Sequence, residues 1–178
     1  MTLTGLQAGA NGVPFIPSRG VIGADFLDLH PDWKIIEEPY SPGEDIVLVP
    51  ATKPDFALIH AYKADKTGNV LAPGYDDRMV AQASDKVIVT VEEIVDYDLA
   101  EDPRGGYVIP WPFVNTVVLS PNAAHPGAME PVYDVDQNHL SEYIVAAKSP
   151  EAYKEYLNKY VIGHTEAEYQ EMVLAVSR

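Results

Sequence analysis

The chain has no cysteine among its 178 residues. Disulfide bonds, a thiolate nucleophile and cysteine-ligated zinc are therefore excluded. Its apolar runs are far shorter than the ~20 residues of a membrane-spanning helix. No basic segment followed by an apolar run stands at the start, so the sequence predicts no secretory signal and no membrane span. We expect a cytoplasmic protein.

Basic residues are scarce, with 12 Lys and Arg against 27 Asp and Glu, for a formal net charge of −15. A nucleic-acid-binding face needs clustered basic residues, so this composition argues against nucleic acid as a partner. It also disfavours any other polyanion unless a local patch supplies positive charge. Four residues are the candidates for such a patch: Arg19, Lys53, Lys63 and Lys66.

Strand-like and helix-like segments alternate along the chain, which predicts an α/β fold with a mostly parallel open sheet flanked by helices. Phe56–Ile59 and Val87–Val91 are apolar runs of the length of a buried strand, and residues 76–84 between them have helical spacing. Two strands joined through a helix form a parallel βαβ unit. We also expect a helix at 2–10 and strands at 13–16, 34–38, 46–49 and 114–119.

The last part of the chain is predicted to be helical. Residues 138–148 form one helix, Ser149-Pro150 starts a second, and Thr165 with Glu168 forms a capping box for a third. Three tyrosines at 153, 156 and 160 stripe the second helix and indicate a packed core or interface. We interpret 1–178 as one domain with a helical C-terminal extension at 137–178.

A polar segment after the first buried strand is the main candidate site. The apolar run ends at His60, and Lys63 leads into the turn Thr67-Gly68-Asn69, where Gly68 can adopt positive φ. Ligands of open parallel sheets bind beyond the carboxyl ends of strands, so His60 is expected beside a ligand. The alternative is a structural histidine that ties the turn through a backbone hydrogen bond. Gly68 and Asn69 also have two interpretations. They are needed for the geometry of the turn, or their backbone N–H groups face a bound anion.

Two other pairs have both a functional and a structural interpretation. Ser18-Arg19 follows an expected strand, and Arg19 either holds a carboxylate or phosphate or forms a surface ion pair. Glu92 and Glu93 follow another strand. Alternation points them to opposite faces, so they cannot act together on one substrate. Either one of them is buried and paired with a charge across a subunit interface, or Glu93 is solvated and Glu92 caps a loop.

A cluster of acidic residues near a histidine raises the question of a metal. Its members are His125, Glu130, Asp134 and Asp136. Their spacing matches no recurrent metal-binding pattern, and dense carboxylates are common in a chain of this charge. The sequence therefore predicts no metal site.

Four segments resemble, in order, motifs of family I CoA-transferase alpha subunits, in particular of the glutaconate CoA-transferase type. Residues 12–19 with 23–25 resemble the "G-[VI]-PF-x-P" loop and the following "G-[TA]-D". Residues 54–70 resemble "HA-x-KAD-x-x-GN", and residues 86–95 resemble "K-V-I-V-T-V-E-E-I-V". Residues 124–126 and 133–136 resemble "AHP" and "YD-x-D". The resemblance covers nearly the whole chain.

The resemblance implies an enzyme that moves CoA from an acyl-CoA to a free carboxylate through a glutamyl-CoA thioester. The glutamate belongs to a beta-type subunit, so no catalytic residue is expected on this chain. A CoA thioester is the substrate, and no permanently bound cofactor is expected. The residues expected near the substrate are Ser18, Arg19, His60, Lys63, Gly68 and Asn69.

The resemblance also implies partners. Besides the beta-type subunit, the family has an N-terminal βαβ half-domain with a Gly-rich loop, which this sequence lacks, so we expect a hetero-oligomer in which another chain supplies that half. Two alternatives remain open: an acyl-CoA ring-opening hydrolase subunit on the same scaffold, and a non-catalytic structural subunit.

Overall fold

A computed structural model describes residues 2–101 and 104–176. These residues form two compact units, and the division falls between Pro121 and Asn122. The helices and strands of the first unit follow in chain order: α1 (Thr2–Ala10), β1 (Phe15–Ser18), η1 (Asp25–Leu29), β2 (Lys34–Glu37), β3 (Asp45–Pro50), β4 (Phe56–Asp65), β5 (Val70–Ala72), α2 (Tyr75–Ala83), β6 (Lys86–Val95), β7 (Tyr107–Ile109), η2 (Trp111–Phe113) and β8 (Thr116–Leu119). None of the helices in these described ranges is long and apolar enough to cross a membrane.

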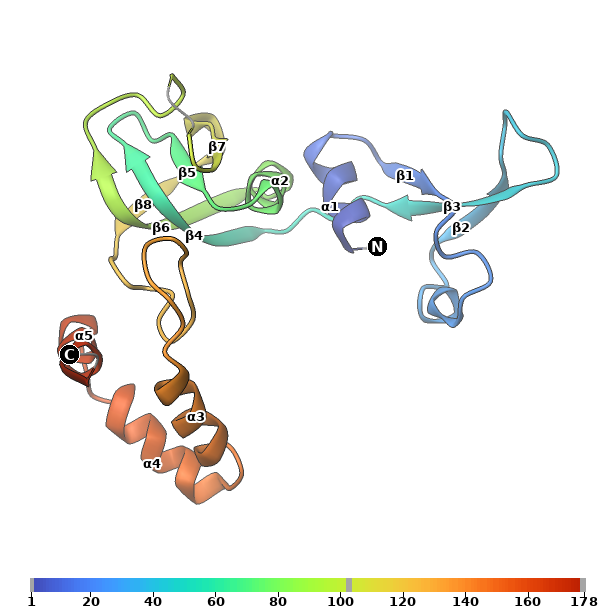
Figure 1. Cartoon of the computed structure of the whole chain (residues 1–178). Coiled ribbons are helices and arrows are strands. Elements are labelled where there is room, and N and C mark those ends of the chain that lie inside the picture. The colour runs from blue at the N-terminus through green and yellow to red at the C-terminus, as the bar shows by residue number, and fades with distance from the viewer. Residues whose placement is uncertain (1, 102–103, 177–178) are drawn as a thin grey trace. The chain divides into compact units, whose positions relative to one another are not determined.

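A five-stranded sheet with the order β7-β5-β4-β6-β8 forms the main body of the first unit (Figure 1). β6 runs parallel to both β4 and β8, whereas β5 is antiparallel to β4 and β7. α2 connects β4 and β5 to β6 and completes the predicted βαβ unit. The predicted α/β fold with helices against a sheet is confirmed.

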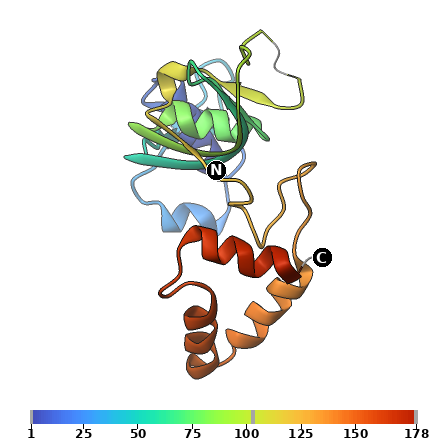
Figure 2. The same cartoon turned by 90° about the vertical axis from the view of Figure 1, so that its left-hand side faces the viewer.

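One face of this sheet forms the core, and the other is open. Val87, Val89 and Val91 of β6 are almost completely buried together with Ala81 of α2, and Figure 2 shows α2 lying against the strands. On the opposite face Leu58 is 77% exposed. The buried strand predicted at Phe56–Ile59 is therefore buried within this chain only at Ala57 and Ile59, because alternate side chains of β4 point away from the core.

The central strands are longer than their apolar runs. β4 continues through His60 to Asp65, and β6 continues through Glu92 to Val95. Pairing continues along this polar stretch, with Lys63 opposite Glu93. Backbone hydrogen bonding between strands does not depend on apolar side chains, so the polar residues remain extended.

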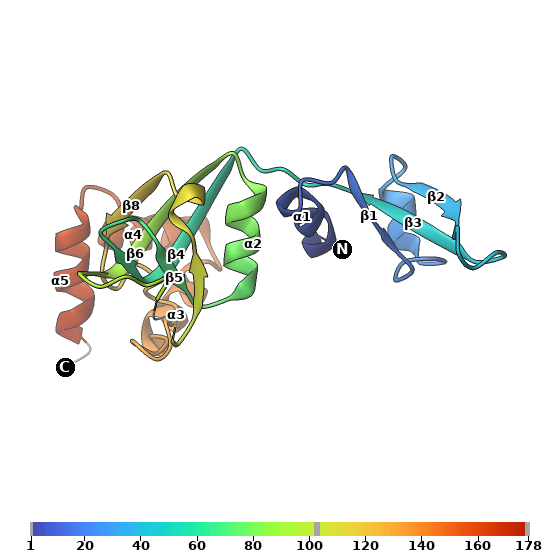
Figure 3. The ribbon, with the colours of Figure 1, turned by 90° about the horizontal axis from the view of Figure 1, so that it is seen from above.

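A second, antiparallel sheet has the order β1-β3-β2, with β3 in the middle (Figure 3). Val47 and Val49 of β3 pack with Val21 and the partly buried Trp33. β2 and β3 lie close to the predicted ranges, while β1 begins at Phe15, two residues after the predicted start.

The second unit contains α3 (Gln137–Ala146), α4 (Pro150–Tyr160) and α5 (Glu166–Val176). The Ser149 side chain accepts a hydrogen bond from the N–H of Ala152, and Thr165 and Glu168 cap each other, as predicted. The predicted helical extension begins at Gln137, as α3 does, and residues 122–136 group with these helices.

Candidate functional site

Three polar side chains meet on the open face of the five-stranded sheet. His60 of β4 lies opposite Thr90 of β6. Its Nδ1 is 2.8 Å from the Thr90 hydroxyl oxygen, and its Nε2 is 2.6 Å from a carboxylate oxygen of Glu92. The His60 and Glu92 side chains are only 18% and 8% exposed. We call His60, Thr90 and Glu92 the sheet-face triad.

The triad holds the imidazole in one orientation. In the neutral ring, Nε2–H donates to Glu92 and Nδ1 accepts from the Thr90 hydroxyl. Both nitrogens then have partners, so His60 can hydrogen-bond a ligand only when one of these contacts opens. A rotation of the Thr90 hydroxyl is the smallest such change.

His60 does not lie where the sequence analysis put it. It is five residues from the end of β4 at Asp65, which corresponds to roughly 16 Å along a strand. The prediction that it lies at a strand end is wrong. The alternative, a backbone hydrogen bond that ties the turn, is not observed either, because the partners of His60 are side chains of β6.

The turn that does follow the end of β4 is organised by Asp65. One carboxylate oxygen accepts from the N–H groups of Thr67, Gly68 and Asn69 at 2.9–3.0 Å. The other accepts from the Asn69 amide at 2.9 Å and from the N–H of Leu99 at 3.1 Å. Burial would raise the pKa of Asp65, but these hydrogen bonds outweigh it and hold the pKa below its ordinary value.

Gly68 and Asn69 therefore fit the turn interpretation. Gly68 has φ +99°, as predicted, and its N–H and that of Asn69 are directed to Asp65 rather than to a ligand. The Asn69 side-chain oxygen accepts from the N–H of Trp111 at 3.1 Å and links the turn to the residues after β7.

Two of the cationic residues predicted near a ligand, Lys63 and Arg19, form ion pairs with glutamates of this chain. Lys63 contacts Glu93 at 2.9 Å, and this contact raises the pKa of Lys63. Because 63 and 93 alternate with 60 and 92, this pair lies on the face opposite the triad. The exposed Arg19 forms ion pairs with Glu44 at 2.8 Å and with the less exposed Glu38 at 3.6 Å, which is the structural alternative.

Ser18 is used locally as well, since its hydroxyl accepts from the N–H of Gly20 at 3.2 Å. The structure thus brings Gly68 and Asn69 together in one turn, while Ser18 and Arg19 belong to the other sheet.

Sequence reasoning missed Thr90 as a site residue and treated Glu92 as a loop cap. The apolar runs alone give a different register: pairing their first residues, Phe56 and Val87, would put His60 opposite Val91, whereas the structure pairs Phe56 with Lys86 and His60 with Thr90. Alternation then puts Glu92 on the same face. The prediction that Glu92 and Glu93 face opposite sides is confirmed by their different partners.

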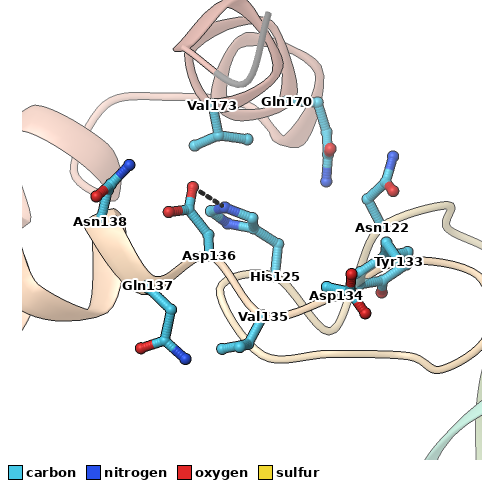
Figure 4. A pocket seen from close by; sticks show the side chains of 10 residues that line it. All are labelled: Asn122, His125, Tyr133, Asp134, Val135, Asp136, Gln137, Asn138, Gln170 and Val173. Carbon is cyan, nitrogen blue, oxygen red and sulfur yellow. Dashed lines mark hydrogen bonds and ion pairs between the residues drawn. The ribbon is translucent and has the colours of Figure 1, made fainter.

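A cavity of about 450 Å³ lies within the second unit. Figure 4 shows the Asp136 carboxylate beside the His125 imidazole, with Gln170 and Val173 of α5 near them. Asp134 lines the cavity too, so three of the four residues considered for a metal are brought together. His139, which the sequence analysis did not consider, is buried next to His125, with ring centroids 4.9 Å apart.

The five-stranded sheet with α2 against one face defines an α/β protein. The family model described as coenzyme A transferase matches residues 1–120. The chain therefore belongs to this family.

Individual relatives agree with that assignment. The A-type subunit of glutaconate CoA-transferase from Acidaminococcus fermentans is 34% identical, over 87% of this chain and 54% of its own length. A crystal structure of that organism's glutaconate coenzyme A-transferase, at 30% identity, gives a TM-score of 0.86 over 98% of this chain and 61% of its own. The A-type subunit of 3-oxoadipate CoA-transferase from Pseudomonas knackmussii is 35% identical, over 88% of this chain and 55% of its own length.

A relative named for a different activity also matches. The cholesterol ring-cleaving hydrolase IpdA subunit of Rhodococcus jostii is 30% identical, over 97% of this chain and 62% of its own length. The chain thus spans 54–62% of the length of these three relatives.

Proposed function

We propose that this chain is part of the A-type subunit of an enzyme that transfers CoA from an acyl-CoA to a free carboxylate. The observation that carries the proposal is the likeness to glutaconate coenzyme A-transferase over 98% of the chain at a TM-score of 0.86. The two relatives named as A-type subunits of CoA-transferases are also more similar in sequence than the hydrolase subunit, at 35% and 34% against 30% identity.

In the proposed reaction a glutamate of a beta-type partner exchanges one carboxylate oxygen for CoA, which forms a glutamyl-CoA thioester and releases the acyl group as its free carboxylate. The acceptor carboxylate then takes CoA from this thioester and returns an oxygen to the glutamate. A covalent carboxylate nucleophile divides one difficult transfer into two easier ones. This chain contributes the acyl pocket, the subunit interface and hydrogen bonds to the thioester oxyanion. The residues that we propose near the thioester remain Ser18, Arg19, His60, Lys63, Gly68 and Asn69.

Among these residues His60 is the best placed to contact a partner or substrate, because it lies on the open sheet face. Phe56 and Leu58 on the same strand face are 63% and 77% exposed. Parallel sheets normally have both faces covered. We propose that the beta-type subunit, or the N-terminal half-domain that the resemblance implies, covers this face and encloses the triad.

A reconstitution experiment tests the function. The purified chain alone should not turn over acyl-CoA, whereas the complex co-purified with a beta-type subunit and the chain that supplies the N-terminal half-domain should consume acyl-CoA only when a carboxylate acceptor is present. Consumption without an acceptor would establish the hydrolase, which the 30% identical hydrolase subunit favours as the second candidate. No turnover with or without an acceptor would favour the alternative of a non-catalytic structural subunit.

The role of His60 is tested in the same complex. His60→Ala removes a partner from the nearly buried Glu92 carboxylate, so the melting temperature should fall by a few degrees while the chain still folds. The turnover per folded molecule of the assembled enzyme should fall much further. The control is Lys154→Ala, an exposed residue of α4, which should change neither. If His60→Ala unfolds the chain while activity per folded molecule stays constant, His60 is structural.

A further inference from the structure

Three groups that can ligate a metal converge beside the cavity of the second unit. They come from His125 in the loop 122–136, from Asp136 and from His139 in the first turn of α3, and one ligand atom of each lies within 4.8 Å of the others. The Nε2 of His125 is 3.3 Å from a carboxylate oxygen of Asp136. Tetrahedral bonds of about 2.0–2.1 Å place neighbouring ligand atoms about 3.4 Å apart, so this pair already has the spacing of a metal site.

Local structure explains why the three groups meet. Asp136 is the N-cap of α3 and accepts the N–H of His139 at 2.9 Å, which puts both side chains on the first turn of the helix. The N–H of Asp136 donates to the carbonyl of Pro126 at 3.0 Å. This backbone contact fixes the loop so that His125 faces the helix start.

Each histidine is oriented by a tyrosine. Nδ1 of His125 lies 2.6 Å from the Tyr169 hydroxyl, and Nε2 of His139 lies 2.7 Å from the Tyr156 hydroxyl. Metal-ligating histidines typically use the second ring nitrogen in this way, which fixes the ring and its tautomer. Nε2 of His125 and Nδ1 of His139 then remain as ligand atoms, and within residues 2–101 and 104–176 Nδ1 of His139 has no hydrogen-bond partner.

A further observation points to a cation. Gln170 lines the same cavity, and its side-chain oxygen Oε1 is buried and accepts no hydrogen bond from the described part of the chain. A buried acceptor without a donor is costly to leave unsatisfied. Because Oε1 is closed off from water, it gains a donor only if the Gln170 side chain rotates it into the cavity of about 450 Å³, where a water bound to a metal ion could donate to it.

We propose that His125, Asp136 and His139 bind a divalent transition-metal ion, with Zn²⁺ as the favoured ion. Two imidazoles and one carboxylate are a borderline ligand set that suits Zn²⁺ better than Ca²⁺ or Mg²⁺. Water completes the coordination. The metal takes the place of the Nε2 proton of His125, and the ring proton then stands on Nδ1, where the Tyr169 hydroxyl accepts it. The ion joins the 122–136 loop to α3.

The test uses the full-length purified chain after removal of metals with a chelator. Co²⁺ should bind as one ion per chain with the visible absorption of a tetrahedral site, and Zn²⁺ should displace it. Asp136→Asn should weaken Zn²⁺ binding more than tenfold in competition with a chelator. Asparagine still caps a helix, so this variant should retain α3. His139→Gln should weaken binding to a similar degree.

Two matched controls test whether metal ions are attracted non-specifically by the negative charge of the chain. Asp134→Asn removes the same charge from the lining of the same cavity, and His164→Gln removes an exposed histidine of the same unit. Both should retain wild-type affinity. If Asp134→Asn weakens binding as much as Asp136→Asn does, the attraction is general and the proposal is wrong.

X-ray absorption of the Zn²⁺-loaded wild-type chain gives an answer that does not depend on any variant. Two imidazoles in the ligand shell are expected. A shell of oxygen atoms alone, or no stoichiometric binding, overturns the proposal.

Discussion

Asp65→Asn should destabilise the chain more than any other single change of a polar residue in the candidate site. The substitution keeps one oxygen for the N–H groups of residues 67–69 but replaces the other with an amide NH₂. That NH₂ would face two donors, the Asn69 amide and the N–H of Leu99. Two buried donors that lose their acceptor cost about 1–3 kcal/mol each, so the free energy of unfolding should fall by about 2–6 kcal/mol. For a chain of this size the melting temperature should drop by about 4–24 °C.

The opposite orientation of the new amide does not avoid the cost, because the N–H groups of residues 67–69 would then lose their acceptor oxygen. The matched control is Asp96→Asn, which removes the same charge from an exposed residue nearby and should change the free energy of unfolding by less than about 0.5 kcal/mol. Urea unfolding followed by circular dichroism measures both. Equal stability of the two variants would refute the role assigned to Asp65.

The pH dependence provides a second check on the same residue. The folded-state pKa of Asp65 is depressed, so its contribution is present above the unfolded-state pKa of about 3.9 and is lost as pH falls through the lower folded-state value. The stability difference between wild type and Asp65→Asn should therefore be constant from pH 5 to 7 and shrink below about pH 4. A difference that persists at lower pH would contradict the reasoning.

Two further changes test backbone and capping effects. Gly68→Ala should lower the free energy of unfolding by about 1–2 kcal/mol, because Gly68 has φ +99° and an L-residue is strained there. The control is Gly20→Ala, since Gly20 lacks positive φ and has room for a Cβ. Denaturant unfolding measures both variants. Ser149→Ala should cost about 1 kcal/mol through loss of the cap to the N–H of Ala152, and Ser149→Asp should restore most of it. Equal stability of the two glycine variants, or no rescue by Asp, would count against these effects.

The helices could be predicted well from the sequence because their ends carry local signals. Ser149-Pro150 and the Thr165–Glu168 box act within one turn, and both cap as predicted. Strand lengths could not be predicted in the same way. Residues 60–65 are mostly polar, yet they continue β4 because β6 and β5 supply backbone partners on both sides.

The candidate site depended on information that is not local. The triad forms because β4 and β6 pair with an offset of 30 residues, visible in the pair His60 and Thr90, and only that register brings Glu92 beside the imidazole. The role of Asp65 was equally hidden, because in a chain with 27 acidic residues nothing in the sequence marks one carboxylate as the acceptor of five hydrogen bonds.

The most direct test of the central claim is the mass of each protein chain of the assembled complex after brief incubation with acyl-CoA. We predict a covalent CoA adduct on a glutamate of the beta-type partner and none on this chain, and the adduct should disappear when a carboxylate acceptor is added. A CoA adduct on this chain, or acyl-CoA turnover without any adduct, would contradict the proposed transfer.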